Sequence, residues 1–240
     1  MAEPALRVRI ARVAEDGAAQ AAAPDWMGAG ERQRWTALTA AGRRAFVASR
    51  RLLRDLLAEA TGLAADGWQL SAEAGSAPLA SRPDSERAAA PPVSIAHRLG
   101  WVAAAVGPPG GGPVGVDIEC RRVARSDPAE RAALVMPRDD LARWHALAAD
   151  RREAALLDAW VAREAWFKAA GGGAPWDFRR LAGEPVDAAD ANVRLWTSGD
   201  VHVALCARDA AALAASACGG WPDAAPVHSS TWRVRVAANA

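Results

Sequence analysis

The sequence predicts a mixed α+β protein made of two halves with similar content. Two long segments carry apolar residues at helical spacing, and short runs with strand-like patterns surround each of them. The glycine- and proline-rich stretch 107–113, GPPGGGP, breaks this pattern and divides the chain into halves at 1–109 and 110–240. The helices expected at 43–61 and 150–170 mirror each other and suggest a duplication, although no residue-level repeat is evident.

The first half is expected to begin with a strand at 5–13, where apolar and polar residues alternate. A helical region over 31–60 follows, with a break near Gly42 and a stop at Gly62. Short strands complete this half, one at 66–72 and a pair over 93–106 that joins at Leu99 and Gly100.

The second half is expected to open with a strand at 114–119. Two helices follow at 127–148 and 150–170, and the glycines at 171–173 end the second one. The remaining strands are expected at 177–183, 192–198, 200–208 and 231–237.

Composition excludes several classes of protein. The 240 residues carry a net charge of +1, which argues against a nucleic-acid binder held by overall charge. No apolar run approaches the roughly 18 residues of a membrane span, and the amino terminus lacks a signal-peptide pattern. The three cysteines (Cys120, Cys206 and Cys218) are widely spaced, which favours reduced thiols in a cytoplasmic protein.

The segment VGVDIE carries the first candidate site. Side chains alternate along a strand, so Asp117 and Glu119 project from one face while Val116 and Ile118 project from the other. Two carboxylates this close repel each other, and a hard cation such as Mg²⁺ would relieve the repulsion. The alternative is a solvated edge strand that happens to carry two acids.

A second candidate lies in WVAREAWFKAAGGG, where Trp160, Glu164 and Lys168 are four residues apart on one helix face. Lys168 is the only lysine beside 28 arginines, so its compact ammonium group could have a specific role. The alternatives are an ordinary surface ion pair and a lysine left by compositional drift.

Basic residues of the first half form the remaining candidates. His97 ends an expected strand, and Arg98 follows it. Guanidinium groups suit phosphates, but a solvated helix face and a structural histidine are the plainer interpretations. The arginines of the long helix stand at positions 43, 44, 50, 51 and 54.

The order and spacing of these motifs resemble those of the 4'-phosphopantetheinyl transferases. The series is RR-x-F-x(3)-RR-x(2)-R, then SIAH, then GVDIE, then W-x(2)-R-E-A-x(2)-K. It is most similar to the larger single-chain type, in which two similar halves form a pseudo-dimer. The resemblance covers roughly residues 40 to 175, and GVDIE and the W-x(2)-R-E-A-x(2)-K segment are its most specific parts.

The resemblance implies an activity, namely that of a holo-acyl-carrier-protein synthase. Such an enzyme transfers the 4'-phosphopantetheine group of coenzyme A to a serine of an apo acyl or peptidyl carrier protein. Asp117, Glu119 and Glu164 match the positions that hold Mg²⁺, and Asp117, Glu164 and Lys168 are the implied catalytic residues. Glu164, directly or through a metal-bound water, would accept the proton of the serine, and adenosine 3',5'-bisphosphate would leave.

The resemblance also implies a coenzyme A site. Lys168 matches the lysine that lies against the phosphates, and Arg44 matches a basic residue near the 3'-phosphate. The family often has serine beside the histidine; here Ala96 and Arg98 flank His97, and Arg98 would replace the missing contact electrostatically. The implied coenzyme-binding residues are Arg44, Arg50, Arg54, His97, Arg98, Arg163 and Lys168.

The implied fold is two α+β halves, each a small antiparallel sheet packed on a long helix, with the site in the cleft between them. The expected protein is a cytoplasmic monomer that serves fatty-acid, polyketide or peptide-synthetase carriers and binds neither nucleic acid nor membrane. One alternative is a non-catalytic relative that binds coenzyme A or a carrier protein without transferring anything, and another is a helical interaction protein whose motif matches are coincidental.

Overall fold

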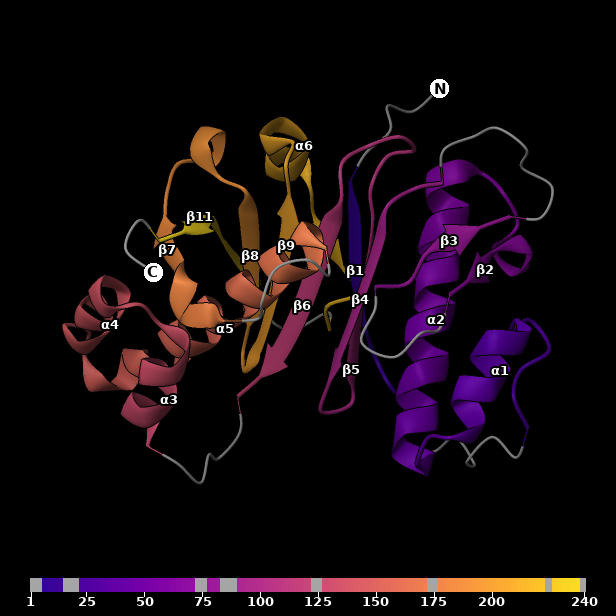
Figure 1. Cartoon of the computed structure of the whole chain (residues 1–240), viewed down its shortest axis with the longest axis horizontal. Helices are drawn as coiled ribbons and strands as arrows, with labels where there is room; N and C mark the ends of the chain where they lie inside the picture. Colours follow the sequence, from indigo (N-terminus) through magenta and orange to yellow (C-terminus); the bar gives the residue numbers. More distant parts are fainter. Residues whose placement is uncertain are drawn as a thin grey trace.

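The computed structural model describes residues 6–14, 22–71, 77–82, 90–121, 127–171, 177–222 and 226–237. It contains helices together with several largely antiparallel sheets, which confirms the expected α+β class (Figure 1). Among the described helices, none is both long and apolar enough to cross a membrane.

A four-stranded sheet forms with α2 against one of its faces (Figure 1). The strand order is β10-β1-β5-β4, with β1 and β10 parallel and the other pairs antiparallel. A strand from the end of the chain thus completes the sheet that the first half begins. The elements are β1 (Arg7–Arg12), α1 (Ala29–Thr36), α2 (Ala40–Thr61), β4 (Val93–Arg98), β5 (Trp101–Val106) and β10 (Cys218–Gly219), with β2 (Gln69–Leu70) and β3 (Ala80–Ser81) as a separate ribbon.

A five-stranded antiparallel sheet follows, in the order β6-β9-β8-β11-β7, and α5 packs on one of its faces. The three short 3₁₀ turns η1 (Ala65–Gly67), η2 (Phe178–Arg180) and η3 (Ala188–Asp190) lie in connections. The elements of this half are β6 (Val114–Cys120), α3 (Pro128–Val135), α4 (Arg138–His145), α5 (Ala149–Ala170), β7 (Leu181–Pro185), β8 (Val193–Ser198), β9 (Val201–Ala207), α6 (Ala210–Ala215) and β11 (His228–Val236).

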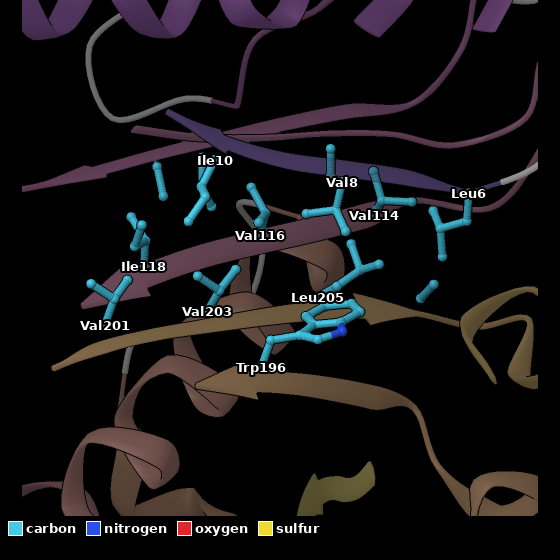
Figure 2. Close-up of a cluster of buried hydrophobic side chains, with 14 of the residues drawn as sticks. Leu6, Val8, Ile10, Val114, Val116, Ile118, Trp196, Val201, Val203 and Leu205 are labelled. Atoms are coloured by element: carbon cyan, nitrogen blue, oxygen red, sulfur yellow. The ribbon is translucent and has the colours of Figure 1, made fainter. Parts of the chain in front are cut away.

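The two sheets pack through their inner faces and share one apolar core (Figure 2). Alternate residues of β1 meet alternate residues of β6 and β9 there, as the two-residue period of a strand requires. The layers therefore run from α2 through the two sheets to α5 (Figure 1). The labelled core residues are Leu6, Val8, Ile10, Val114, Val116, Ile118, Trp196, Val201, Val203 and Leu205.

The helices carry an internal repeat that the sequence analysis missed. Helices α1 and α4 have 8 residues each, and α2 and α5 have 22 each. Helices α1 and α2 begin at residues 29 and 40, and α4 and α5 begin at residues 138 and 149. The offset is 109 positions in both cases. Side chains match at the same offset, because Trp144 repeats Trp35 and Leu147 repeats Leu38. The expectation that no residue-level repeat exists is therefore corrected.

Several element boundaries differ from the expected ones for local reasons. The helical break expected near Gly42 lies between Thr36 and Ala40, because the Thr39 hydroxyl accepts a hydrogen bond from the Gly42 amide and begins a new helix. The helix expected at 127–148 is two helices, because Pro137 interrupts it. The expected strand 66–72 is reduced to the two residues of β2.

The seam between the sheets runs along β4 and β6, which are edge strands of their sheets and contact each other. The Ser94 hydroxyl accepts a hydrogen bond from the Val116 amide across this seam at 3.0 Å. The expected pair of strands over 93–106 is present, and Leu99 and Gly100 form its turn with φ values of 44° and 78°. This turn places His97 and Arg98 at the end of β4.

Candidate functional site

A cavity of about 310 Å³ lies at the seam, where α2 and β4 face β6 and α5. It brings together residues that are far apart in the sequence and that belong to separate predicted motifs, among them Arg50, His97 and Asp117. Its lining residues are Arg34, Phe46, Ser49, Arg50, Ile95, Ala96, His97, Arg98, Asp117, Ile118, Glu119, Glu164 and Lys168.

Close packing of β6 on α5 positions the acids of this cavity. A Cβ atom at Gly115 would lie 2.0 Å from the Ala165 carbonyl oxygen and 2.6 Å from the Ala169 amide nitrogen, so only glycine fits there. Two residues further along the same face of the strand, Asp117 reaches Lys168 of the helix. The first residue of the GVDIE motif therefore sets the distance at which the acids meet the helix.

Lys168 links two of the three carboxylates. Its ammonium nitrogen lies 2.5 Å from Oδ1 of Asp117 and 3.6 Å from Oε2 of Glu164. The Trp160 indole donates a hydrogen bond of 2.9 Å to Oε1 of Glu164, which fixes the orientation of that carboxylate. The helix face expected from the four-residue spacing thus faces a cavity and is not a simple surface ion pair.

Glu119, the third carboxylate, meets a cation from the other half of the molecule. Nε of Arg98 lies 2.8 Å from Oε2 of Glu119, and the two side chains are 37% and 13% exposed. The strand that carries Arg98 belongs to the first sheet, and the strand that carries Glu119 belongs to the second. The ion pair therefore spans the seam.

Asp117 is the most deeply buried of the three acids, with 4% of its surface exposed. Burial raises its pKa to about 8, against the opposing effect of the Lys168 ammonium and with a further upward contribution from Glu164. Its Oδ2 atom is buried and has no hydrogen-bond partner. This carboxylate therefore offers one oxygen atom that an additional cation would satisfy.

The donor set fits a hard divalent cation, because carboxylate oxygens are the ligands that Mg²⁺ prefers. Asp117, Glu119 and Glu164 line one cavity, and the unpartnered Oδ2 of Asp117 lies among them. Among the described residues, no three acidic, histidine or cysteine side chains are arranged as a finished metal site. Lys168 and Arg98 contact the three carboxylates in this structure.

The opposite wall of the cavity is basic. Arg50 is 5% exposed, donates a hydrogen bond of 2.7 Å to the Ser71 carbonyl and lies over the Phe46 ring. Its pKa is lowered to about 10, chiefly by burial. The pKa of His97 is also lowered, by partial burial and then by the positive charges of Lys168, Arg34 and Arg98. Such a wall is suited to an anionic ligand.

Two residues expected to bind the coenzyme do not reach this cavity. Arg54 and Arg163 are both fully buried, and each forms an ion pair with an acid of the preceding short helix. Arg54 pairs with Glu31 at 2.6 Å, and Arg163 pairs with Asp140. Because each guanidinium is used inside its own half, the expectation of direct coenzyme contact is corrected for both.

These buried pairs repeat the helical offset. Glu31 and Arg54 are 23 positions apart, and so are Asp140 and Arg163. In both halves the arginine also donates through Nε to a backbone carbonyl, that of Trp68 or that of Leu181. Each arginine therefore joins its long helix to the short helix before it and to the chain after it. The repeated spacing of the acid and the arginine is the sequence signal that could have revealed the two pairs.

The remaining predicted and unpredicted residues lie around the cavity or away from it. Arg44 is half-buried on α2 and is not among the residues that line the cavity. Several lining residues were not expected as site residues, namely Arg34, Phe46, Ser49, Ile95 and Ile118. A larger cavity of about 750 Å³ lies between the start of α4 and the strands β7 and β11, and it shares no lining residue with the first.

A cavity that combines three carboxylates with a wall of arginines is typical of proteins that bind phosphate esters together with a divalent cation. The model of the 4'-phosphopantetheinyl transferase superfamily matches residues 113–220, which include β6 and α5. Residues 113–220 therefore carry a domain of that superfamily, which supports the family suggested by the sequence motifs. No curated protein matches the chain.

Proposed function

We propose that this protein transfers the 4'-phosphopantetheine group of coenzyme A to a serine of an apo carrier protein in a Mg²⁺-dependent reaction. The observation that carries the proposal is the seam cavity, in which the first half contributes cations and the second half contributes carboxylates. The superfamily domain at 113–220 supports phosphopantetheinyl transfer in general. Coenzyme A, the apo carrier protein and Mg²⁺ are our proposals beyond this general activity.

Coenzyme A is the proposed donor because it carries a pyrophosphate and a 3'-phosphate. The three arginines of the basic wall, Arg34, Arg50 and Arg98, have the charge to hold such a ligand. His97 lies among them, and because its pKa is lowered it would contribute a hydrogen bond rather than a charge. Arg44 lies outside the cavity lining on the same helix as Arg50, so it remains a candidate for a more distant phosphate.

Asp117, Glu119 and Glu164 are the proposed Mg²⁺ ligands. When bound, Mg²⁺ would neutralise phosphate charge and so favour attack at phosphorus. The three acids line one cavity, and Asp117 retains an unpartnered oxygen.

The chain's own groups account for the proton movements of the proposed transfer. The serine oxygen of the carrier forms a bond to the β-phosphorus, which bears the pantetheine, and the bond from that phosphorus to the bridging oxygen breaks. Glu164, held by Trp160 through Oε1, would accept the serine proton at Oε2. The Lys168 ammonium, 3.6 Å from that oxygen, would stabilise the departing adenosine 3',5'-bisphosphate.

We infer that the partner is an apo acyl or peptidyl carrier protein and that the chain works as a monomer in the cytoplasm. Both walls of the cavity come from one chain, which supports the monomer. The three cysteines are free, which supports a reducing compartment.

The deciding experiment is intact-protein mass spectrometry of an apo carrier protein incubated with this protein, coenzyme A and Mg²⁺. We expect a mass gain of one phosphopantetheine, and we expect EDTA to abolish it. Several unrelated carriers should be tried, because fatty-acid, polyketide and peptide-synthetase carriers all present a serine. If a folded sample binds coenzyme A but modifies none of them, the protein is a non-catalytic relative and the proposal fails.

A further inference from the structure

Arg98 holds an unusual position at the seam, because it is a cation of one half that contacts an acid of the other. Its Nε atom lies 2.8 Å from Oε2 of Glu119. Its backbone is fixed at the end of β4, where Arg98 pairs with Trp101 of β5. The side chain is 37% exposed and lies on a long flexible stem, so it can change partners without any movement of the strand.

The ion pair with Arg98 engages Glu119, which is one of the three carboxylates proposed to bind the metal ion. Lys168 contacts Asp117 and Glu164, so the chain's own cations reach all three carboxylates. Lys168 comes from the helix that also carries Glu164, whereas Arg98 comes from the opposite half. A divalent cation that takes Glu119 as a ligand therefore competes with Arg98.

An entering phosphate would offer Arg98 another partner. Arg98 lines the same cavity as Arg34, Arg50 and His97, which form the basic wall. A phosphate can bind a guanidinium through two parallel hydrogen bonds, whereas Nε of Arg98 lies near Glu119 without hydrogen-bond geometry. A phosphate in this cavity would therefore draw Arg98 away from Glu119.

We propose that Arg98 couples the two ligands of the cavity, because it blocks Glu119 until a phosphate ligand draws it away. The cation then binds weakly to the empty protein and more tightly to the protein that already holds the phosphate compound. Thermodynamic linkage requires the reverse effect as well, so the cation tightens phosphate binding by the same factor. This inference rests on the proposed function, because it concerns the same cavity and the same two ligands.

The test is a direct measurement of Mn²⁺ binding by calorimetry and by the electron paramagnetic resonance signal of free Mn²⁺, without any carrier protein. Wild type and Arg98→Ser are compared in the absence of coenzyme A and at saturating coenzyme A. We expect Arg98→Ser to bind Mn²⁺ roughly three- to tenfold more tightly than wild type when coenzyme A is absent. With coenzyme A present, the advantage of the variant should disappear or reverse.

A matched control separates this effect from a general loss of positive charge. Arg9 of β1, in the same sheet, forms an ion pair with Glu59, and these two side chains are 36% and 41% exposed. Arg9→Ser removes an arginine of nearly the same exposure as Arg98 from an ion pair away from the cavity, and it should leave Mn²⁺ affinity unchanged. Arg98→Gln, which keeps a polar side chain without the charge, should behave like Arg98→Ser and guards against a folding defect.

Equal Mn²⁺ affinity of wild type, Arg98→Ser and Arg98→Gln without coenzyme A would overturn the inference. Equal tightening in Arg9→Ser would overturn it too, because the effect would then be one of net charge. These results are distinct from a failure of the proposed function, which is measured separately as carrier modification. An enzyme that modifies its carrier but shows no change in Mn²⁺ binding on loss of Arg98 retains the function and lacks the coupling.

Discussion

At the scale of single residues, the proposed chemistry depends on a carboxylate that the fold keeps out of water. Asp117 is 4% exposed, and its Oδ2 atom lacks a partner. Asp117→Asn keeps the shape and removes the charge that would hold a cation, so we expect carrier modification to fall at least about 100-fold, with the melting temperature unchanged or higher. The measurements are the transfer rate by mass spectrometry and thermal unfolding.

A matched control for this variant is Asp190→Asn. Asp190 also forms an ion pair, with Arg233, but its side chain is 66% exposed and lies outside the cavity. This control should transfer at the wild-type rate. Normal transfer by Asp117→Asn itself would show that the cavity has been assigned the wrong chemistry.

Lys168 allows a subtler test, because its position between two acids depends on a compact charge. Its nitrogen lies 2.5 Å from Asp117 and 3.6 Å from Glu164. Lys168→Arg keeps the charge but replaces a compact point charge with a planar fork whose donors point in fixed directions. We expect kcat to fall by more than about tenfold while the dissociation constant for coenzyme A rises by less than about threefold. Losses of equal size in both would instead indicate that Lys168 only binds the ligand.

At the scale of elements, two buried ion pairs hold equivalent helices together. Asp140 accepts hydrogen bonds from Arg163 and from the Gly183 amide, and Glu31 accepts two from Arg54. Asp140→Ala leaves the Arg163 charge buried without a partner, so we expect a loss of about 3–5 kcal/mol in the free energy of unfolding. Glu31→Ala should lose a similar amount, because the same contact repeats there.

The measurement for these two variants is urea unfolding followed by circular dichroism, with Asp139→Ala as the control. Asp139 precedes Asp140 in the same helical turn and is exposed, so its loss should change stability by less than about 0.5 kcal/mol. A loss of this small size in Asp140→Ala as well would mean that the pair is not a structural anchor.

The contact between β6 and α5 gives a second prediction at this scale. A Cβ atom at position 115 would lie 2.0 Å from the Ala165 carbonyl oxygen, so Gly115→Ala must push the strand away from the helix. We expect a destabilisation of about 1–3 kcal/mol or more, together with slower carrier modification, because Asp117 moves with the strand. Gly112→Ala is the control, since a Cβ there has 3.8 Å to its nearest neighbour. Full activity in Gly115→Ala would show that the strand position is not critical.

Sequence patterns predicted the elements that are determined by residues close together in the sequence. The strand VGVDIE and the helix that carries Glu164 and Lys168 lie where the two-residue and 3.6-residue periods placed them. The seam that joins their acids to Arg98 depends on contacts between distant residues, so no local pattern reveals it. Arg54 and Arg163 were expected in the coenzyme site, but each pairs with a buried acid. The helical spacing of an arginine does not indicate whether its charge contacts a phosphate or a buried carboxylate.

At the scale of the whole molecule, the helices repeat at a constant offset, whereas the lining of the cavity does not. Phe46, Ser49 and Arg50 of α2 line the seam cavity. The residues of α5 that lie 109 positions later are Ala155, Asp158 and Ala159, so the side chains differ. These recurring positions line a separate, more apolar cavity of about 370 Å³ against β7 and β11. The basic wall is thus present in the first half and replaced in the second, and the residues 107–113 connect the two halves at the seam.

This asymmetry predicts that one chain is enough for activity. The basic wall comes from the first half and the carboxylates come from the second, so both contributions to the site are always present in a single chain. We therefore expect the transfer rate per molecule of enzyme to stay constant as the enzyme is diluted from micromolar to nanomolar concentration. Sedimentation equilibrium over the accessible part of that range should give the mass of one chain, 25.1 kDa. A site assembled between two chains would instead lose specific activity on dilution, in step with the dissociation of a dimer, because half of its groups would leave with the partner.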